Sequence, residues 1–193
     1  MTASFIFIGS THGFIDDFLK QKEIIEAVKP EFVLCENLEN LELNSKEKFE
    51  EVIKKKKISD MTSFQEVEKL VLFCFSHNIK LIGIDLKNFG FDKTQQKKIK
   101  NQEELSKKEE SEIERLLFLR ERQHLNKIKE YQKKTNKPLV IILGCWYLRD
   151  NSLLRNNLEN YKIVAPCDKK GNLLMSPPEN NDIRYCEIKS DGK

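Results

Sequence analysis

Long apolar runs and a leader-like N-terminus are both missing from this chain of 193 residues. No apolar run approaches the roughly 20 residues that a membrane-spanning helix requires. The first residues, MTASFIFIGSTHG, have no basic region ahead of their short apolar stretch and so differ from a secretory signal peptide. We therefore expect a protein that resides in the cytoplasm and has no membrane partner.

An excess of positive charge is missing too, because 34 basic residues stand against 31 acidic ones, for a formal net charge of +3. Proteins that bind nucleic acids usually present a strongly basic face, so nucleic acid is not an expected partner. The basic run at 54–57 follows an acidic stretch and is typical of a solvated helix end. The motifs of P-loop proteins, dinucleotide-binding proteins and Gly-x-Ser-x-Gly hydrolases are also absent.

Cysteine is scarce and irregularly spaced. The cysteines are odd in number, far apart and mostly within apolar runs: Cys35, Cys74, Cys145, Cys167 and Cys186. No two of them have the Cys-x-x-Cys spacing that indicates zinc. This pattern favours buried free thiols over disulfides.

The apolar fraction of 39% and the charged fraction of 34% are typical of a folded protein with a charged surface. The length fits a single domain spanning residues 1–193. Short apolar runs bounded by polar or turn residues predict strands at 4–9, 31–36, 80–86 and 138–144. Strands that are apolar on both faces are usually covered on both sides. We therefore predict an α/β fold with a mainly parallel central sheet and helices on both faces.

Helical periodicity and turn residues complete this outline. Apolar residues recur at helical spacing between the first two strands and over 45–56 and 62–77. The stretch 93–111 is almost without apolar residues, which predicts a mobile or protruding charged insertion. An apolar stripe over 112–134 predicts a helix that packs on the sheet. After residue 160, short candidate strands separated by Gly, Pro and Asn predict β-hairpin strands at the sheet edge.

Polar residues follow the predicted strands at their carboxyl ends, where ligands bind in open α/β sheets. A glycine closes the first strand and another closes a late strand, and each precedes a ring-bearing polar residue by three positions: Gly9 with His12, and Gly144 with Tyr147. Two acidic residues, Glu36 and Asp85, lie at the ends of the strands between them. The remaining cleft candidates are Ser10, Thr11 and Trp146, which neighbour the two glycines. These loops could surround one cleft.

The order of these motifs resembles that of a known group of proteins. GSTHG, KPEFVLCE, IGID, LRERQHLNKI and VIILGCWY follow one another as in the TraB/PrgY and Tiki (GumN) families, over about residues 4–150. Related domains are the ChaN haem-binding lipoproteins and the erythromycin esterases. The resemblance implies an active centre made of a first Gly-x-x-His, an acidic residue, an arginine and a second Gly-x-x-His. These fall here on His12, Glu36, Arg120 and Tyr147, so tyrosine replaces the second histidine.

The resemblance further implies hydrolysis of a peptide or a small-molecule ester in a cleft at the strand ends. His12 and Glu36 are the candidate ligands of a divalent metal ion, which would be zinc, manganese or cobalt. A phenol at Tyr147 would weaken a catalytic metal site. Without a metal, Glu36 could act as a general base while Arg120 stabilises an anionic intermediate.

Other roles for the same residues stay open. Asp85 matches an aspartate of the group, although Leu86 follows it where an arginine is common. Glu36 could form a structural salt bridge with Arg120. His124, which lies one helical turn after Arg120, could pack in the core or reach the cleft. The main alternative is therefore a non-catalytic member of the same fold that binds a ligand or peptide.

Structural roles also compete at the cleft loops. Ser10 or Thr11 could cap the following helix while His12 bonds a nearby carbonyl group, and Trp146 could belong to the core. A third hypothesis is an interaction protein that binds its partner through the charged region 93–134. The sequence names no substrate and leaves the oligomeric state open.

Overall fold

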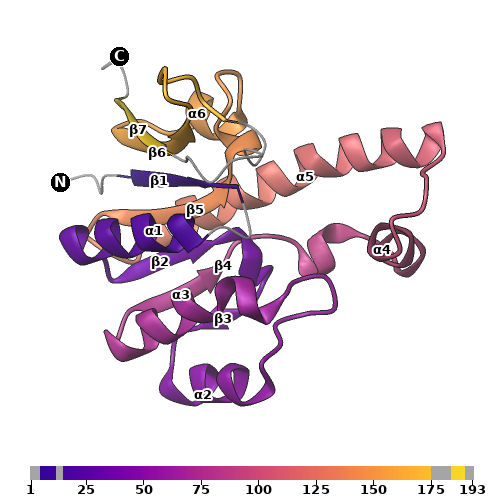
Figure 1. The fold of residues 1–193 in the computed structure, drawn as a ribbon. Coiled ribbons are helices and arrows are strands. Elements are labelled where there is room, and N and C mark those ends of the chain that lie inside the picture. The colour runs from indigo at the N-terminus through magenta and orange to yellow at the C-terminus, as the bar shows by residue number, and fades with distance from the viewer. Residues whose placement is uncertain (1–4, 12–14, 175–183, 190–193) are drawn as a thin grey trace.

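A seven-stranded sheet runs through the chain in the order β3-β4-β2-β5-β1-β6-β7 (Figure 1). The structure, a computed structural model, describes residues 5–11, 15–174 and 184–189. The strands are β1 (Phe5–Ser10), β2 (Phe32–Cys35), β3 (Glu42–Leu43), β4 (Lys80–Gly83), β5 (Leu139–Gly144), β6 (Tyr161–Cys167) and β7 (Arg184–Lys189). The five central strands are parallel, whereas β3 and β7 are antiparallel to their neighbours at the two edges. The predicted fold class is confirmed.

Helices cover both faces of this sheet. They are α1 (Ile15–Val28), α2 (Lys46–Lys55), α3 (Phe64–Ser76), α4 (Lys93–Lys100), α5 (Lys107–Gln132) and α6 (Leu153–Asn157), with short 3-10 turns η1 (Glu36–Leu38), η2 (Lys87–Gly90) and η3 (Cys145–Leu148). Successive strand residues point to opposite faces. Ile141 of β5 therefore packs in one core with Ile128 of α5, and Ile142 packs in another core with Ile25 of α1 and Val71 of α3.

The charged stretch 93–111 contains helical structure that the sequence did not predict. Asp92 and Gln95 form a capping box at the start of α4, and Ser106 and Glu109 form another at the start of α5. An ion pair of 2.7 Å between Lys98 and Glu109 joins these two helices. Figure 1 shows α4 and the first turns of α5 extending away from the sheet as an arm. Local capping thus organises a segment that buries little apolar surface.

The C-terminal strands lie at the sheet edge as predicted, but they carry a disulfide that the sequence did not predict. Cys167 of β6 and Cys186 of β7 are joined, and their Cα atoms are 6.0 Å apart. In the antiparallel register Cys167 lies opposite Arg184, so the two cysteines are diagonal neighbours. The prediction of free thiols is wrong for this pair, because sequence spacing does not reveal the register of two edge strands. Three other cysteines are free and buried: Cys35, Cys74 and Cys145.

None of the helices in the described part of the chain is both long and apolar enough to cross a membrane. Disulfides persist mainly in oxidising compartments, whereas the sequence predicts a cytoplasmic location. The cytoplasmic location therefore stays a prediction.

Reduction of the disulfide should lower the free energy of unfolding by about 3 kcal/mol, because the link spans a sequence separation of 19 residues. In a chain of this size the corresponding drop in Tm is about 5–10 °C. Thermal unfolding with and without a phosphine reductant measures the effect, and Cys186→Ser serves as the control that should not respond to reductant. A wild-type Tm that reductant leaves unchanged would contradict a stabilising link between β6 and β7.

Candidate functional site

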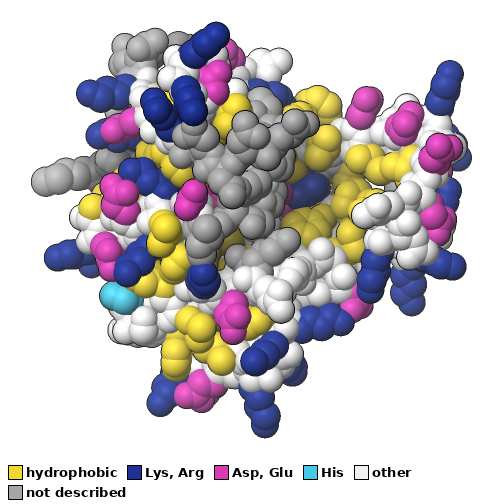
Figure 2. Space-filling view, in the orientation of Figure 1, with side chains coloured by type: hydrophobic (Ala, Val, Ile, Leu, Met, Phe, Trp, Pro, Cys, Tyr) yellow, Lys and Arg dark blue, Asp and Glu magenta, His cyan; other side chains and the backbone are white. Residues whose placement is uncertain are grey.

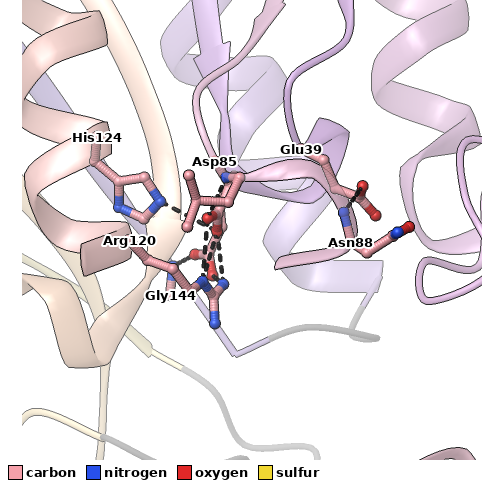
Figure 3. A network of polar contacts seen from close by, with 8 residues as sticks. Glu39, Asp85, Asn88, Arg120, His124 and Gly144 are labelled. Atoms are coloured by element: carbon pink, nitrogen blue, oxygen red, sulfur yellow. Dashed lines mark hydrogen bonds and ion pairs between the residues drawn. The ribbon is translucent and has the colours of Figure 1, made fainter. Parts of the chain in front are cut away.

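A buried guanidinium joins carboxylates from two strand ends. Arg120 comes from α5, Glu36 directly follows β2, and Asp85 follows β4. Arg120 Nη2 donates to Glu36 Oε1 at 2.7 Å and to Asp85 Oδ2 at 2.6 Å, while Arg120 Nε donates to Asp85 Oδ2 at 2.9 Å (Figure 3). All three residues are buried. We call Arg120, Glu36 and Asp85 the Arg120 cluster; it lies where open α/β sheets bind ligands.

Glu36 also completes the backbone hydrogen bonding of the sheet. Its Oε2 accepts the N–H of Gly144 at 2.6 Å. The pairing of β2 with β5 ends at Cys35 and Ile142, and η1 then turns the chain away. The Glu36 side chain therefore supplies the acceptor that the β2 backbone no longer provides, and both of its oxygens are engaged.

Asp85 is fully buried and held in its ionised form. Burial alone would raise the pKa of Asp85, but hydrogen bonds and charges from His124 and Arg120 outweigh burial and hold the pKa below its usual range. The Nε2 atom of His124 lies 3.2 Å from Asp85 Oδ2, and the N–H of Leu86 donates to Asp85 Oδ1 at 2.6 Å. Burial likewise opposes the charge of Arg120, yet Asp85 raises its pKa above the ordinary value. Both groups are therefore charged at neutral pH.

Tyr147 and His124 pack against each other beside the Arg120 cluster. Their ring centroids are 4.6 Å apart, and Arg120 Cζ lies 5.6 Å from the centre of the Tyr147 ring. His124 is fully buried and Tyr147 is 3% exposed. The hydroxyl of Tyr147 has no hydrogen-bond partner among the described residues. Burial, followed by the charge of Glu36, raises the pKa of Tyr147 above its ordinary value, so the hydroxyl stays protonated.

One edge of the Arg120 guanidinium is unused. Its Nε and Nη2 atoms hold the carboxylates, whereas Nη1 donates to no residue that the structure describes. Figure 3 shows one guanidinium nitrogen pointing away from the dashed contacts. Because two carboxylates face one guanidinium, the three residues of the Arg120 cluster together carry a net negative charge. The site thus offers a cationic donor within a negatively charged surrounding.

The structure brings most of the sequence-predicted site residues together: Glu36, Asp85, Arg120, His124, Gly144 and Tyr147. Trp146 is half-buried beside them, with its ring centroid 5.1 Å from that of Tyr147. His12 lies outside the described residues.

The end of β1 is organised around a different carboxylate. Ser10 and Thr11 both donate to Asp17, in the first turn of α1, rather than to the Arg120 cluster. Gly9 allows η3 to approach β1, because a Cβ atom there would lie 2.8 Å from Cys145 Sγ. These contacts therefore tie the end of β1 to α1 and η3.

Three buried acidic residues near the strand ends were missed by sequence reasoning: Asp17, Glu39 and Glu121. Glu121 accepts hydrogen bonds from both terminal nitrogens of Arg149, whose guanidinium lies 3.6 Å from the centre of the Trp146 ring. Glu39 accepts the N–H of Asn88, and its other oxygen has no partner among the described residues. Acidic residues in charged or loop segments are usually exposed, so the sequence held little signal for their burial.

The described residues do not provide a metal site. No group of three or more His, Cys, Asp or Glu side chains among them is placed to hold a metal ion. Both oxygens of Glu36 and both of Asp85 already accept hydrogen bonds from N–H groups.

No protein-family model, curated protein or solved structure matches the chain. The resemblance to the TraB/PrgY and Tiki families therefore stays a hypothesis.

Asp85→Asn should lower the free energy of unfolding by about 3–5 kcal/mol at pH 7, because it leaves the buried Arg120 charge poorly compensated. The folded-state pKa of Asp85 lies below its usual range, so its ionisation stabilises the fold above the unfolded value of about 3.9. This contribution is lost as the pH falls from about 4 through the folded-state pKa.

Urea unfolding of wild type and Asp85→Asn from pH 7 to pH 2.5 measures this difference. Asp150→Asn is the matched control, since the Asp150 side chain is 95% exposed and its loss should change little at any pH. A deficit of the Asp85 variant that stays constant down to pH 2.5 would contradict the assignment of an ionised, buried Asp85.

Proposed function

We propose that this protein is a hydrolase-like enzyme that acts on a neutral ester or amide at the carboxyl ends of β2, β4 and β5. The observation that carries the proposal is the Nη1 atom of Arg120, which donates to none of the described residues while Glu36 and Asp85 fix the rest of the guanidinium. A fixed cationic donor is suited to a carbonyl oxygen that becomes negatively charged during hydrolysis. Burial strengthens this interaction because little water competes with it.

The charge of the cluster favours a neutral substrate over an anion. Two carboxylates already face Arg120, so an added carboxylate or phosphate would meet net negative charge. A carbonyl oxygen accepts the same hydrogen bond without bringing a charge in the ground state. Its charge develops only as water adds to the carbonyl carbon, with a second water molecule carrying the released proton to the departing alcohol or amine. Arg120 therefore stabilises the transition state more than the bound substrate.

Tyr147 and Glu36 take different roles in this proposal from those that the sequence predicts. The raised pKa of Tyr147 keeps its hydroxyl protonated, so it serves as a neutral donor to the substrate rather than as a nucleophile. Glu36 holds Arg120 with one oxygen and Gly144 with the other. We therefore assign Glu36 to positioning of the guanidinium instead of to proton abstraction. The proposal includes no metal ion, because the described donor groups are already bound to N–H groups.

Binding without turnover is the second candidate function. It is favoured by the combination of a fully engaged Glu36 and a tyrosine where the resembled families have a second histidine. These features leave Glu36 without an unengaged oxygen to act as a general base. A carbonyl compound would then bind to Arg120 and dissociate unchanged.

Arg120→Lys should lower kcat/KM for p-nitrophenyl butyrate by about 100-fold or more, since lysine keeps the charge but cannot hold two carboxylates and a substrate in a planar fork. Release of p-nitrophenol above the protein-free rate is the measurement. Arg122→Lys, on the exposed side of the same helix, is the matched control and should retain wild-type turnover. Equal turnover of both variants would reject Arg120 as the donor, and absence of turnover in the wild type would favour binding alone.

Tyr147→Phe separates a functional role from a structural one. Removal of a buried hydroxyl without a partner should raise the free energy of unfolding by about 1–3 kcal/mol. The same change should lower kcat/KM by about 10- to 100-fold if the hydroxyl donates to the substrate. Urea unfolding and the ester assay are run on the same preparation. A stabilised variant with full activity would exclude the hydroxyl from the reaction.

Chelation should leave ester turnover unchanged, because no step of the proposed reaction uses a metal ion. The wild-type protein is dialysed against EDTA, its metal content is measured by elemental mass spectrometry, and its activity is compared before and after dialysis. Loss of activity that zinc, manganese or cobalt restores would contradict the metal-free reaction and return the metal hypothesis.

A further inference from the structure

A continuous row of aromatic rings leads from the surface to the Arg120 cluster. The Phe118 side chain of α5 is 54% exposed, and its ring centroid lies 6.0 Å from that of Trp146. The Trp146 ring contacts the ring of Tyr147 at 5.1 Å, and Tyr147 lies beside Arg120. Phe89 adds another ring, with its centroid 4.9 Å from Arg120 Cζ. The rings therefore form an unbroken series of contacts from the exposed Phe118 to the buried Arg120.

Trp146 is held in place by an ion pair between the buried Glu121 and the partly exposed Arg149. The guanidinium of Arg149 lies 3.6 Å from the centre of the indole and also donates to the backbone oxygen of Trp146. Glu121, which is fully buried, fixes Arg149 with two hydrogen bonds. A half-buried indole with such support is preorganised, so an apolar ligand would lose little of its binding free energy to ordering of the Trp146 side chain.

Apolar surface is concentrated at the same place. Leu119, next to Phe118 in α5, is 43% exposed. Figure 2 shows hydrophobic side chains gathered where the arm of α4 and α5 leaves the body of the molecule. Large exposed apolar side chains that adjoin one another mark binding surfaces more often than isolated ones do. The ring contacts that lead from this surface to Arg120 favour an occupant that has both a polar carbonyl group and an apolar part.

We propose that the substrate is an ester or amide with a bulky uncharged acyl group, which lies along Phe118 and Trp146 while its carbonyl oxygen binds Arg120. This inference rests on the proposed function for the position of the carbonyl group. The acyl group should be uncharged, because the Arg149 charge beside Trp146 is already paired with Glu121 and the Arg120 cluster is negatively charged. Medium-chain acyl compounds are the simplest members of this substrate class.

Binding is tested first, with Trp146 as the reporter, because it is the single tryptophan of the chain. Octanamide and acetamide are titrated while tryptophan emission is recorded. Octanamide should bind at least about 10-fold more tightly, since its longer chain buries more methylene groups. Phe118→Ala should weaken octanamide binding by about 5- to 10-fold. Leu72→Ala, a matched change of a 41% exposed residue on α3, should leave binding unchanged.

Two further titrations test whether a ligand on Phe118 and Trp146 also binds to the Arg120 cluster. Octanoate should bind more weakly than octanamide because its carboxylate meets the negative charge of Glu36 and Asp85. Arg120→Lys should weaken octanamide binding as well, since the carbonyl oxygen loses its donor. Equal binding of octanoate, or octanamide binding that does not depend on Arg120, would overturn the inference and leave an apolar patch without connection to the cluster.

Ester assays then distinguish failure of this inference from failure of the proposed function. The expected result is that p-nitrophenyl octanoate exceeds p-nitrophenyl acetate in kcat/KM, and that Phe118→Ala reduces only the octanoate reaction. Turnover of both esters with equal kcat/KM and no effect of Phe118→Ala would overturn the placement of the acyl group on Phe118 and Trp146 but would leave hydrolysis supported. Binding of octanamide that depends on Phe118 and Arg120, with no ester turned over, would support binding of the acyl group at Phe118 and Trp146 and would reject hydrolysis.

Discussion

The burial of a single guanidinium between two carboxylates determines how the rest of the site is built. Arg120 projects from α5 toward the ends of β2 and β4, where Glu36 and Asp85 meet it. A buried charge without partners would be very costly, so the helix and both strands must keep their relative positions for the chain to fold. The same constraint holds the guanidinium in one orientation.

The constraint extends outward through neighbouring buried groups. Glu36 ties the cluster to β5 through the N–H of Gly144, and His124 touches both Asp85 and Tyr147. The next residue along α5 after Arg120 is Glu121, which fixes Arg149 against Trp146. One helix therefore positions both the polar cluster and the aromatic row, and a shift of α5 would disturb both together.

The sequence predicts the strands and the polar residues at their ends, because apolar runs and turn residues are local signals. It raises a Glu36–Arg120 salt bridge only as an alternative, and it does not predict the pairing of Arg120 with Asp85. That pairing depends on the rotation and register of α5 against the sheet, which no local pattern encodes. The disulfide between Cys167 and Cys186 was missed for a similar reason, since it depends on the register of two edge strands.

Tyr147 shows how one residue could decide the chemistry of the whole site. An imidazole at this position could become protonated and pair with Glu36, whereas the phenol stays neutral and adds no positive charge to the cluster. Arg120 therefore remains the cationic donor of the cluster, and the surplus of carboxylate disfavours anionic ligands. The buried hydroxyl lacks a partner among the described residues, and unsatisfied polar groups of this kind are expected where function outweighs stability. The Tyr147 hydroxyl and the Arg120 Nη1 atom are thus both donors without a partner in the described part of the chain, as a site for a neutral carbonyl compound would require.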